Sequence, residues 1–117
     1  MFEQPQKQQD NSSSEDALFI LKELASNPQL TQRDLSRTIG ISLGKTNYLI
    51  KELAKKGLLK IINFTHKDQK LKRISYILTP QGLKEKADLT LHFLKRKQEE
   101  YESLRRELEK LKQEGHK

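Results

Sequence analysis

The segment that follows Ser42 gathers donor, aromatic and small side chains on a short stretch of chain. Ammonium and amide groups suit guanine and adenine edges, a glycine allows close backbone approach, and an apolar or aromatic group can touch a thymine methyl. The segment therefore offers five candidates for reading base edges: Leu43, Gly44, Lys45, Asn47 and Tyr48. For each residue taken alone, the alternative is an ordinary solvated position on a helix.

Basic and hydroxyl side chains surround this segment. Residues 31–86 hold 13 basic and 4 acidic side chains, an excess of nine, whereas residues 1–30 and 87–117 are acidic or nearly balanced. Lysine and arginine gathered on one unit release counterions from a phosphate backbone, so the excess favours a polyanionic partner over a merely solvated basic surface. The phosphate-contacting candidates are Thr31, Arg33, Ser42, Lys51, Lys55, Lys67, Lys70, Lys72 and Arg73.

Two capped helices must position these side chains. Thr31 and Asp34 have the spacing of a capping box, which predicts a helix that begins after Thr31 and ends at Gly40. Ser42 is a second capping residue, and it predicts a longer helix that ends before Gly57. A short helix, a tight turn and a second helix form the helix-turn-helix order, in which the second helix enters the major groove of double-stranded DNA.

The flanking segments complete a small domain. The β-branched and aromatic residues of 58–64 and 74–78 predict two strands, and the polar residues 65–73 between them predict a hairpin with a basic tip. Upstream, apolar residues at helical spacing predict a helix from about residue 15 to Ser26: Leu18, Leu21, Leu24 and Ala25. Residues 1–14 have almost nothing to bury, so we expect a disordered arm there.

A heptad pattern runs through the last third of the chain. Six of eight seam positions are apolar or aromatic when the seam is set at Ala87, Thr90, Leu94, Lys97, Tyr101, Leu104, Leu108 and Leu111. This pattern predicts a coiled coil over residues 83–114, although a single helix folded back on the domain would also use it. The dimerisation candidates are Leu94, Tyr101, Leu104, Leu108 and Leu111.

Four short segments resemble one family. They are Thr31-Gln32-Arg33-Asp34-Leu35, Gly40-Ile41-Ser42, Leu53-Ala54-Lys55-Lys56-Gly57-Leu58-Leu59 and Leu78-Thr79-Pro80-Gln81-Gly82. Their order resembles that of the MarR-type winged-helix regulators, and the tail from Phe93 to Glu102 is similar to a small branch of them linked to exopolysaccharide gene clusters. The resemblance implies a homodimer that binds a pseudo-palindromic operator, with repression as the commoner outcome.

The remaining residues exclude other classes of function. The chain has no cysteine, and His66, His92 and His116 are dispersed, so spacing assembles neither a metal set nor a nucleophile triad. We therefore expect no enzyme and no cofactor, and neither a signal peptide nor a membrane span is apparent, which favours a cytoplasmic protein. A small-molecule effector remains unassigned.

The sequence thus predicts a mainly α fold with a small β-hairpin (α+β): a winged helix-turn-helix over residues 15–82 and a long C-terminal coiled-coil helix. The alternative function is a winged-helix protein-interaction or scaffolding module that assembles through its coiled coil.

Overall fold

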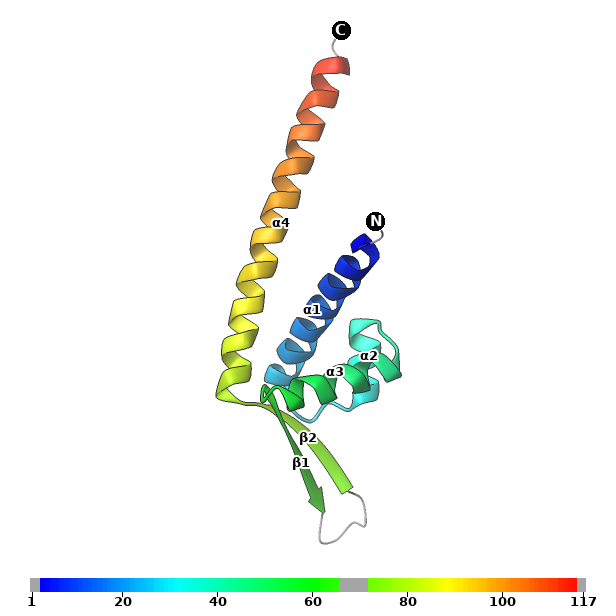
Figure 1. The fold of residues 1–117 in the computed structure, drawn as a ribbon, viewed down its shortest axis with the longest axis vertical. Helices are drawn as coiled ribbons and strands as arrows, with labels where there is room; N and C mark the ends of the chain where they lie inside the picture. Colours follow the sequence, from blue (N-terminus) through cyan, green and yellow to red (C-terminus); the bar gives the residue numbers. More distant parts are fainter. Residues whose placement is uncertain (1–2, 66–71, 116–117) are drawn as a thin grey trace.

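The computed structural model describes residues 3–65 and 72–115, with side chains described for residues 13–63 and 74–115. The fold is mainly helical with one two-stranded antiparallel hairpin, which confirms the predicted fold class. Figure 1 shows a small domain from which one long helix projects. The elements in chain order are α1 (Glu3–Ser26), α2 (Gln32–Ile39), α3 (Leu43–Lys55), β1 (Leu59–Thr65), β2 (Lys72–Leu78) and α4 (Pro80–Gly115).

Helix α1 is longer than expected. It ends at Ser26 as predicted, but it begins at Glu3, so residues 3–14 are helical where a disordered arm was expected. Glutamine, glutamate and lysine lose little side-chain freedom in a helix, which favours the continuation of α1 through this polar segment. At the other end of α1, Ile20 is buried and Ala25 is exposed, because Ala25 lies about 100° around the helix from buried Leu24 and outside the apolar face.

The caps of α2 and α3 confirm the predicted boundaries. The Thr31 hydroxyl accepts from the Asp34 amide at 3.0 Å, and the Asp34 carboxylate accepts from the Thr31 amide at 3.1 Å. Gly40 ends α2 with φ of 81°, a conformation that favours glycine. The Ser42 hydroxyl accepts from the Lys45 amide at 3.0 Å and begins α3. These caps fix the relative positions of the two helices.

The Asp34 cap gives a testable pH dependence. The Thr31 amide, which donates to the carboxylate, lowers the pKa of Asp34 below its ordinary value. A lowered folded-state pKa stabilises the fold above the unfolded value of about 3.9, and this stabilisation is lost as the pH falls through the folded pKa. We expect Asp34→Asn to lower the free energy of unfolding at neutral pH, as measured by denaturant titration. Below about pH 4 the difference in this free energy between the variant and the wild type should become smaller. A difference that stays constant with pH would contradict this.

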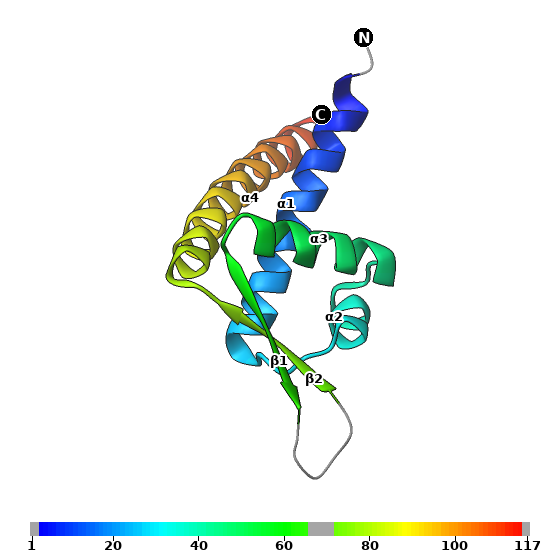
Figure 2. The same cartoon turned by 60° about the horizontal axis from the view of Figure 1, so that its bottom comes forward.

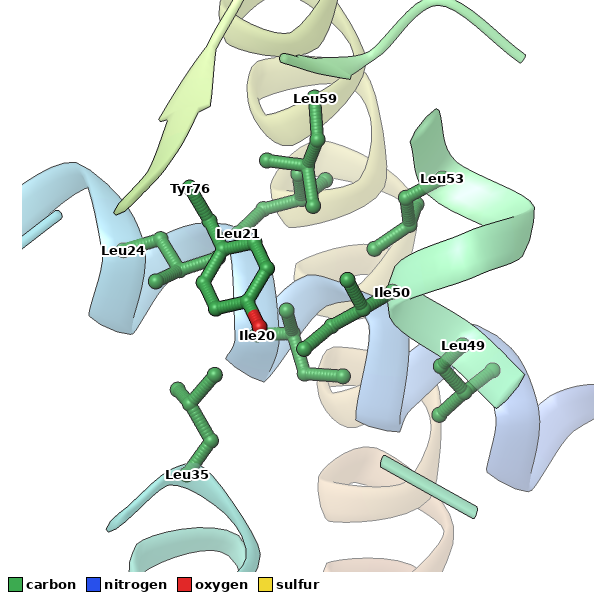
Figure 3. Close-up of a cluster of buried hydrophobic side chains, with 9 residues drawn as sticks. All are labelled: Ile20, Leu21, Leu24, Leu35, Leu49, Ile50, Leu53, Leu59 and Tyr76. Atoms are coloured by element: carbon green, nitrogen blue, oxygen red, sulfur yellow. The ribbon is translucent and has the colours of Figure 1, made fainter. Parts of the chain in front are cut away.

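One apolar cluster joins the helices to the hairpin. Figure 3 shows side chains from α1, α2, α3 and both strands converging, with the Tyr76 ring lying among leucines and isoleucines. The buried members are Ile20, Leu21, Leu24, Leu35, Leu49, Ile50, Leu53, Leu59 and Tyr76. Burial of each large side chain contributes about 1.5–3 kcal/mol, so this cluster sets the position of α3 on the domain.

The hairpin is anchored at its base. Strands β1 and β2 pair in register from Leu59 opposite Leu78 to Thr65 opposite Lys72, close to the predicted strands and slightly longer. The Tyr76 amide also donates to the Pro28 carbonyl oxygen at 3.2 Å, which ties β2 to the loop after α1. Figure 2 shows the hairpin projecting beside α2 and α3 as a wing.

A tight junction attaches α4 to the domain. The Thr79 hydroxyl donates to the Gly57 carbonyl oxygen at 2.6 Å and accepts from the Gly82 amide at 2.9 Å. The Thr79 amide donates to the Leu58 carbonyl oxygen at 3.1 Å. Gly82 is buried against this same carbonyl, and a Cβ at that position would overlap the oxygen. The junction therefore requires glycine and fixes the direction in which α4 leaves the domain.

Helix α4 spans 36 residues without a break, about 54 Å, and makes up most of the long dimension of the 76 × 32 × 26 Å molecule. Its first half packs on α1, where the rings of Phe19 and Phe93 meet edge to face at 6.4 Å. Residues 98–115 are exposed throughout. Among the described residues, no helix combines the length and apolar character needed to span a membrane.

Candidate nucleic-acid interface

Helix α3 presents one exposed face. Thr46, Leu49, Ile50 and Leu53 are buried toward the core. The opposite side of a helix with 3.6 residues per turn carries Gly44, Tyr48, Lys51 and Lys55, and all four are exposed. Tyr48 is 60% exposed, a high value for an aromatic side chain. This outer face combines close backbone approach, one aromatic ring and two cations.

Lys45 lies on one flank of this face and not at its centre. Its ammonium group is 2.9 Å from the Asp16 carboxylate of α1, and Asp16 is largely buried, with its side chain 13% exposed. The carboxylate therefore draws the ammonium toward α1. The role of Lys45 in base reading stays a prediction, and it requires Lys45 to exchange Asp16 for a base edge.

Asn47 lies on the other flank, within a chain of hydrogen bonds. Its Nδ2 donates to Gln32 Oε1 at 3.1 Å, and Gln32 Nε2 donates to the Tyr76 hydroxyl at 3.2 Å. These bonds link α3, α2 and β2. Because an amide nitrogen carries two hydrogens, one hydrogen and Oδ1 of Asn47 remain for an adenine edge. Gln32 was not among the predicted site residues, and only the structure places it beside Asn47.

Substitution of Asn47 and Gln32 separates reading from positioning. We expect Asn47→Ala to relax the preference at one operator position, at a cost of about 1–3 kcal/mol. We expect Gln32→Ala to relax the preference at the same position by a smaller factor, because Gln32 orients Asn47 and Asn47 itself is retained. Binding motifs determined for both variants provide the comparison. An unchanged motif for Asn47→Ala would reject the base-reading role.

A groove of about 530 Å³ lies between the start of α2, the first turn of α3 and β2. Three predicted residues line it, namely Thr31, Arg33 and Leu43. Ile74 lines it as well and is 46% exposed, although the sequence suggested only a strand position for this residue. Exposed Leu43 and Ile74 thus form an apolar patch next to a guanidinium group, and apolar patches of this kind can contact thymine methyl groups.

The phosphate candidates with a described position are distributed over helix α2 with its cap, helix α3 with its cap, and strand β2. Ser42 and Thr31 are exposed and both serve as helix caps, and Lys51 and Lys55 lie on the outer face of α3. Lys72 and Arg73 lie in β2, opposite Thr65 and Phe64. Lys67 and Lys70 lie outside the described residues. The groove brings the start of α2 next to the first turn of α3. The phosphate roles stay predictions.

Lys51 provides a test of the outer face. We expect Lys51→Ala to weaken binding to all DNA sequences alike and to lower the slope of log affinity against log salt by about one. Lys110→Ala is the matched control, because Lys110 is exposed on α4 far from α3. Salt titrations of DNA retardation would measure both variants. A sequence-selective loss, or an unchanged salt slope, would count against a phosphate contact.

A family model of winged helix-turn-helix DNA-binding domains matches residues 20–60. This segment is therefore similar to winged helix-turn-helix domains. The match covers the end of α1, all of α2 and α3, and the first residues of β1, so it includes the helices that carry the outer face and part of the groove. No curated protein sequence matches the chain.

Solved structures extend the comparison to the whole fold. The smu.1704 protein from Streptococcus mutans UA159 is 26% identical, with a TM-score of 0.64, and the match covers 73% of this chain and 81% of that protein. A MarR family transcription regulator, SP03579, is 18% identical with a TM-score of 0.58 over 75% of this chain, which spans only 56% of that regulator.

MepR, described as a transcription regulator of the Staphylococcus aureus multidrug efflux pump MepA, is 19% identical with a TM-score of 0.53, over 95% of this chain and 96% of MepR. The chain therefore has the winged-helix fold found in MarR-family regulators. The family match and these solved structures thus agree on a winged-helix fold.

Proposed function

We propose that the chain is a sequence-specific transcriptional regulator that binds double-stranded DNA as a homodimer in the cytoplasm. In this proposal α3 enters the major groove and the β1–β2 wing lies on the adjacent backbone or minor groove. The observation that carries it is the outer face of α3, with Gly44, Tyr48, Lys51 and Lys55 exposed beside the groove lined by Arg33. A helix with this face and a flanking basic hairpin matches the contacts that winged domains make.

The finer role rests on the sequence resemblance. We propose repression as the outcome of binding, and genes for exopolysaccharide synthesis as the targets, because Leu78-Thr79-Pro80-Gln81-Gly82 and the tail from Phe93 resemble that branch of MarR-type regulators. The dimer is supported by the exposed heptad seam of α4, where Leu94, Tyr101 and Leu108 are each more than half exposed. Whether an effector is bound is left open by this proposal.

Selection of bound genomic fragments tests the proposal. Two reading helices of a dimer must lie about 34 Å apart to meet successive turns of the major groove, so the half-sites should be about 10 base pairs apart, centre to centre. We expect the enriched fragments to share an inverted repeat with this spacing, located upstream of the regulated genes. Enrichment without a common motif would reject sequence-specific regulation.

The exposed seam also favours a second candidate, a scaffolding module that assembles with another protein. Leu104, Leu108 and Leu111 are 69%, 53% and 57% exposed and do not themselves specify a partner. Sedimentation of the purified chain together with DNA retardation at low salt separates the candidates. A strict monomer that does not retard DNA would favour scaffolding over regulation.

A further inference from the structure

The unpartnered half of α4 carries a charge pattern that specifies how a second copy would pair with it. In the heptad with Leu94, Tyr101 and Leu108 at one seam position, the residues that directly precede that position are Phe93, Glu100, Glu107 and Glu114. The residues that directly follow the other seam position are Leu91, Gln98, Arg105 and Lys112. From Glu100 onward, one flank is therefore entirely acidic and the other flank is basic.

The two possible orientations bring different flanks together. In a parallel, in-register pair, each residue of the acidic flank meets the residue of the basic flank that lies five positions later in the sequence of the partner. Glu100 then meets Arg105, and Glu107 meets Lys112, and two-fold symmetry repeats both attractive pairs. In an antiparallel pair, like flanks face each other, so glutamates would oppose glutamates and cations would oppose cations.

The geometry points to a parallel, in-register two-stranded coiled coil formed by α4 of two copies of this chain. This inference rests on the homodimer of the proposed function and adds its orientation and register. All four charged side chains belong to the exposed segment 98–115, so they are available to a partner. Glu100 and Arg105 make only loose contacts within their own helix, with Lys97 at 3.5 Å and Glu102 at 4.0 Å.

The seam is continuous with an apolar groove nearer the domain. This groove, about 390 Å³, lies between α1 and α4 and is lined by Leu18, Phe19 and Phe93 together with the seam residues Thr90, Leu94 and Lys97. The seam therefore runs from the domain to the end of α4. A parallel pair places both domains at the same end of a rod about 54 Å long, whereas an antiparallel pair separates them along it.

Lys97 fits this register. It occupies a seam position, its ammonium group lies 5.2 Å from the centre of its own Phe93 ring, and it contacts Glu100. A polar residue at one seam position lowers coil stability but favours the register in which the two copies of that residue lie side by side. In the parallel, in-register pair the two copies of Lys97 face each other, and each ammonium group is held by the Phe93 ring and the Glu100 carboxylate of its own helix.

Distance measurement between labels tests the orientation directly. The chain has no cysteine, so Glu99→Cys, Arg106→Cys and Gln113→Cys each introduce one spin-label site on the side of α4 opposite the seam. A parallel pair predicts nearly equal label distances at all three positions. An antiparallel pair predicts an axial separation that changes by about 21 Å for each step of seven residues, so three equal distances would be impossible. Unequal distances would overturn the orientation and leave the homodimer intact.

Charge exchange provides a second measurement. We expect Glu100→Lys with Glu107→Lys to raise the dimer dissociation constant by roughly tenfold or more, because four attractive contacts become repulsive. Adding Arg105→Glu and Lys112→Glu to the same chain restores opposite signs and the original net charge, so dimerisation should recover. Absence of weakening, or absence of recovery, would contradict the parallel pairing.

These measurements are made without DNA, so their failure is separable from failure of the proposed function. A monomer in sedimentation would overturn both the pairing and the homodimer. DNA retardation by the same unlabelled chain then reports independently on whether the winged domain binds DNA.

Discussion

A chain carrying both Leu104→Glu and Leu108→Glu is expected to bind a full inverted repeat at least about a hundredfold more weakly than the wild type does. The two glutamates would face their counterparts across the seam and separate the copies. Each copy would then bind DNA through one reading helix alone. It would lose the gain in affinity that a second, physically linked reading helix provides by raising the effective concentration at the other half-site. Binding to a single half-site should stay unchanged, because α3 and the wing are untouched.

Leu104 and Leu108 are suited to this experiment because both are exposed in the single chain, at 69% and 53%. Glutamate has nearly the helix propensity of leucine, so α4 should remain helical. Ser103→Glu with Gln113→Glu is the matched control, since it adds the same charge on exposed positions away from the seam. Equal affinity of wild type and double variant for the full repeat would contradict dimeric binding.

Gly82→Ala is expected to destabilise the fold through a steric overlap that no other glycine of the chain would meet. A methyl group there would overlap the Leu58 carbonyl oxygen, a backbone atom that accepts the Thr79 amide and cannot rotate away. Overpacking of a tight site costs about 1–3 kcal/mol, which outweighs the gain of up to about 1 kcal/mol that alanine brings to a helix interior. The free energy of unfolding from denaturant titration would measure the loss.

Gly44→Ala is the control for this prediction. Gly44 also lies within a helix, but a Cβ there would meet nothing within 4 Å. We expect Gly44→Ala to leave stability unchanged or to raise it by up to about 1 kcal/mol, while its methyl group lies on the outer face of α3. If Gly82→Ala were as stable as Gly44→Ala, the close approach of α4 to Leu58 would not be a structural requirement.

Local signals in the sequence were sufficient for the helix boundaries around the reading helix. The Thr31–Asp34 capping box, the stop at Gly40 and the cap at Ser42 all involve residues within a few positions of each other, so their chemistry can be read from spacing alone. The start of α1 could not be read in this way, because residues 3–14 are polar and contain no apolar periodicity that would predict a helix.

The contacts of the candidate interface were less accessible to sequence analysis. Asp16 holds Lys45 across 29 positions of the chain, and Tyr76 reaches Gln32 across 44. No local pattern encodes which flank of α3 faces α1 and which faces β2, because that depends on how the core seats the helix. The same holds for Gly82, whose neighbour Leu58 is fixed by the turn from β2 into α4.

Helix α4 is continuous from its cap at Thr79. A small change of angle at the Gly82 junction is therefore amplified along the length of the helix. A helix of 36 residues is about 54 Å long, so a rotation of about 10° at the base moves the far end by roughly 9 Å. Conversely, shifts of a few ångströms at the far end turn the domains by only a few degrees. The spacing between two reading helices would therefore be set by the first turns after Gly82. The distal turns would stabilise the dimer without setting the orientation of the domains.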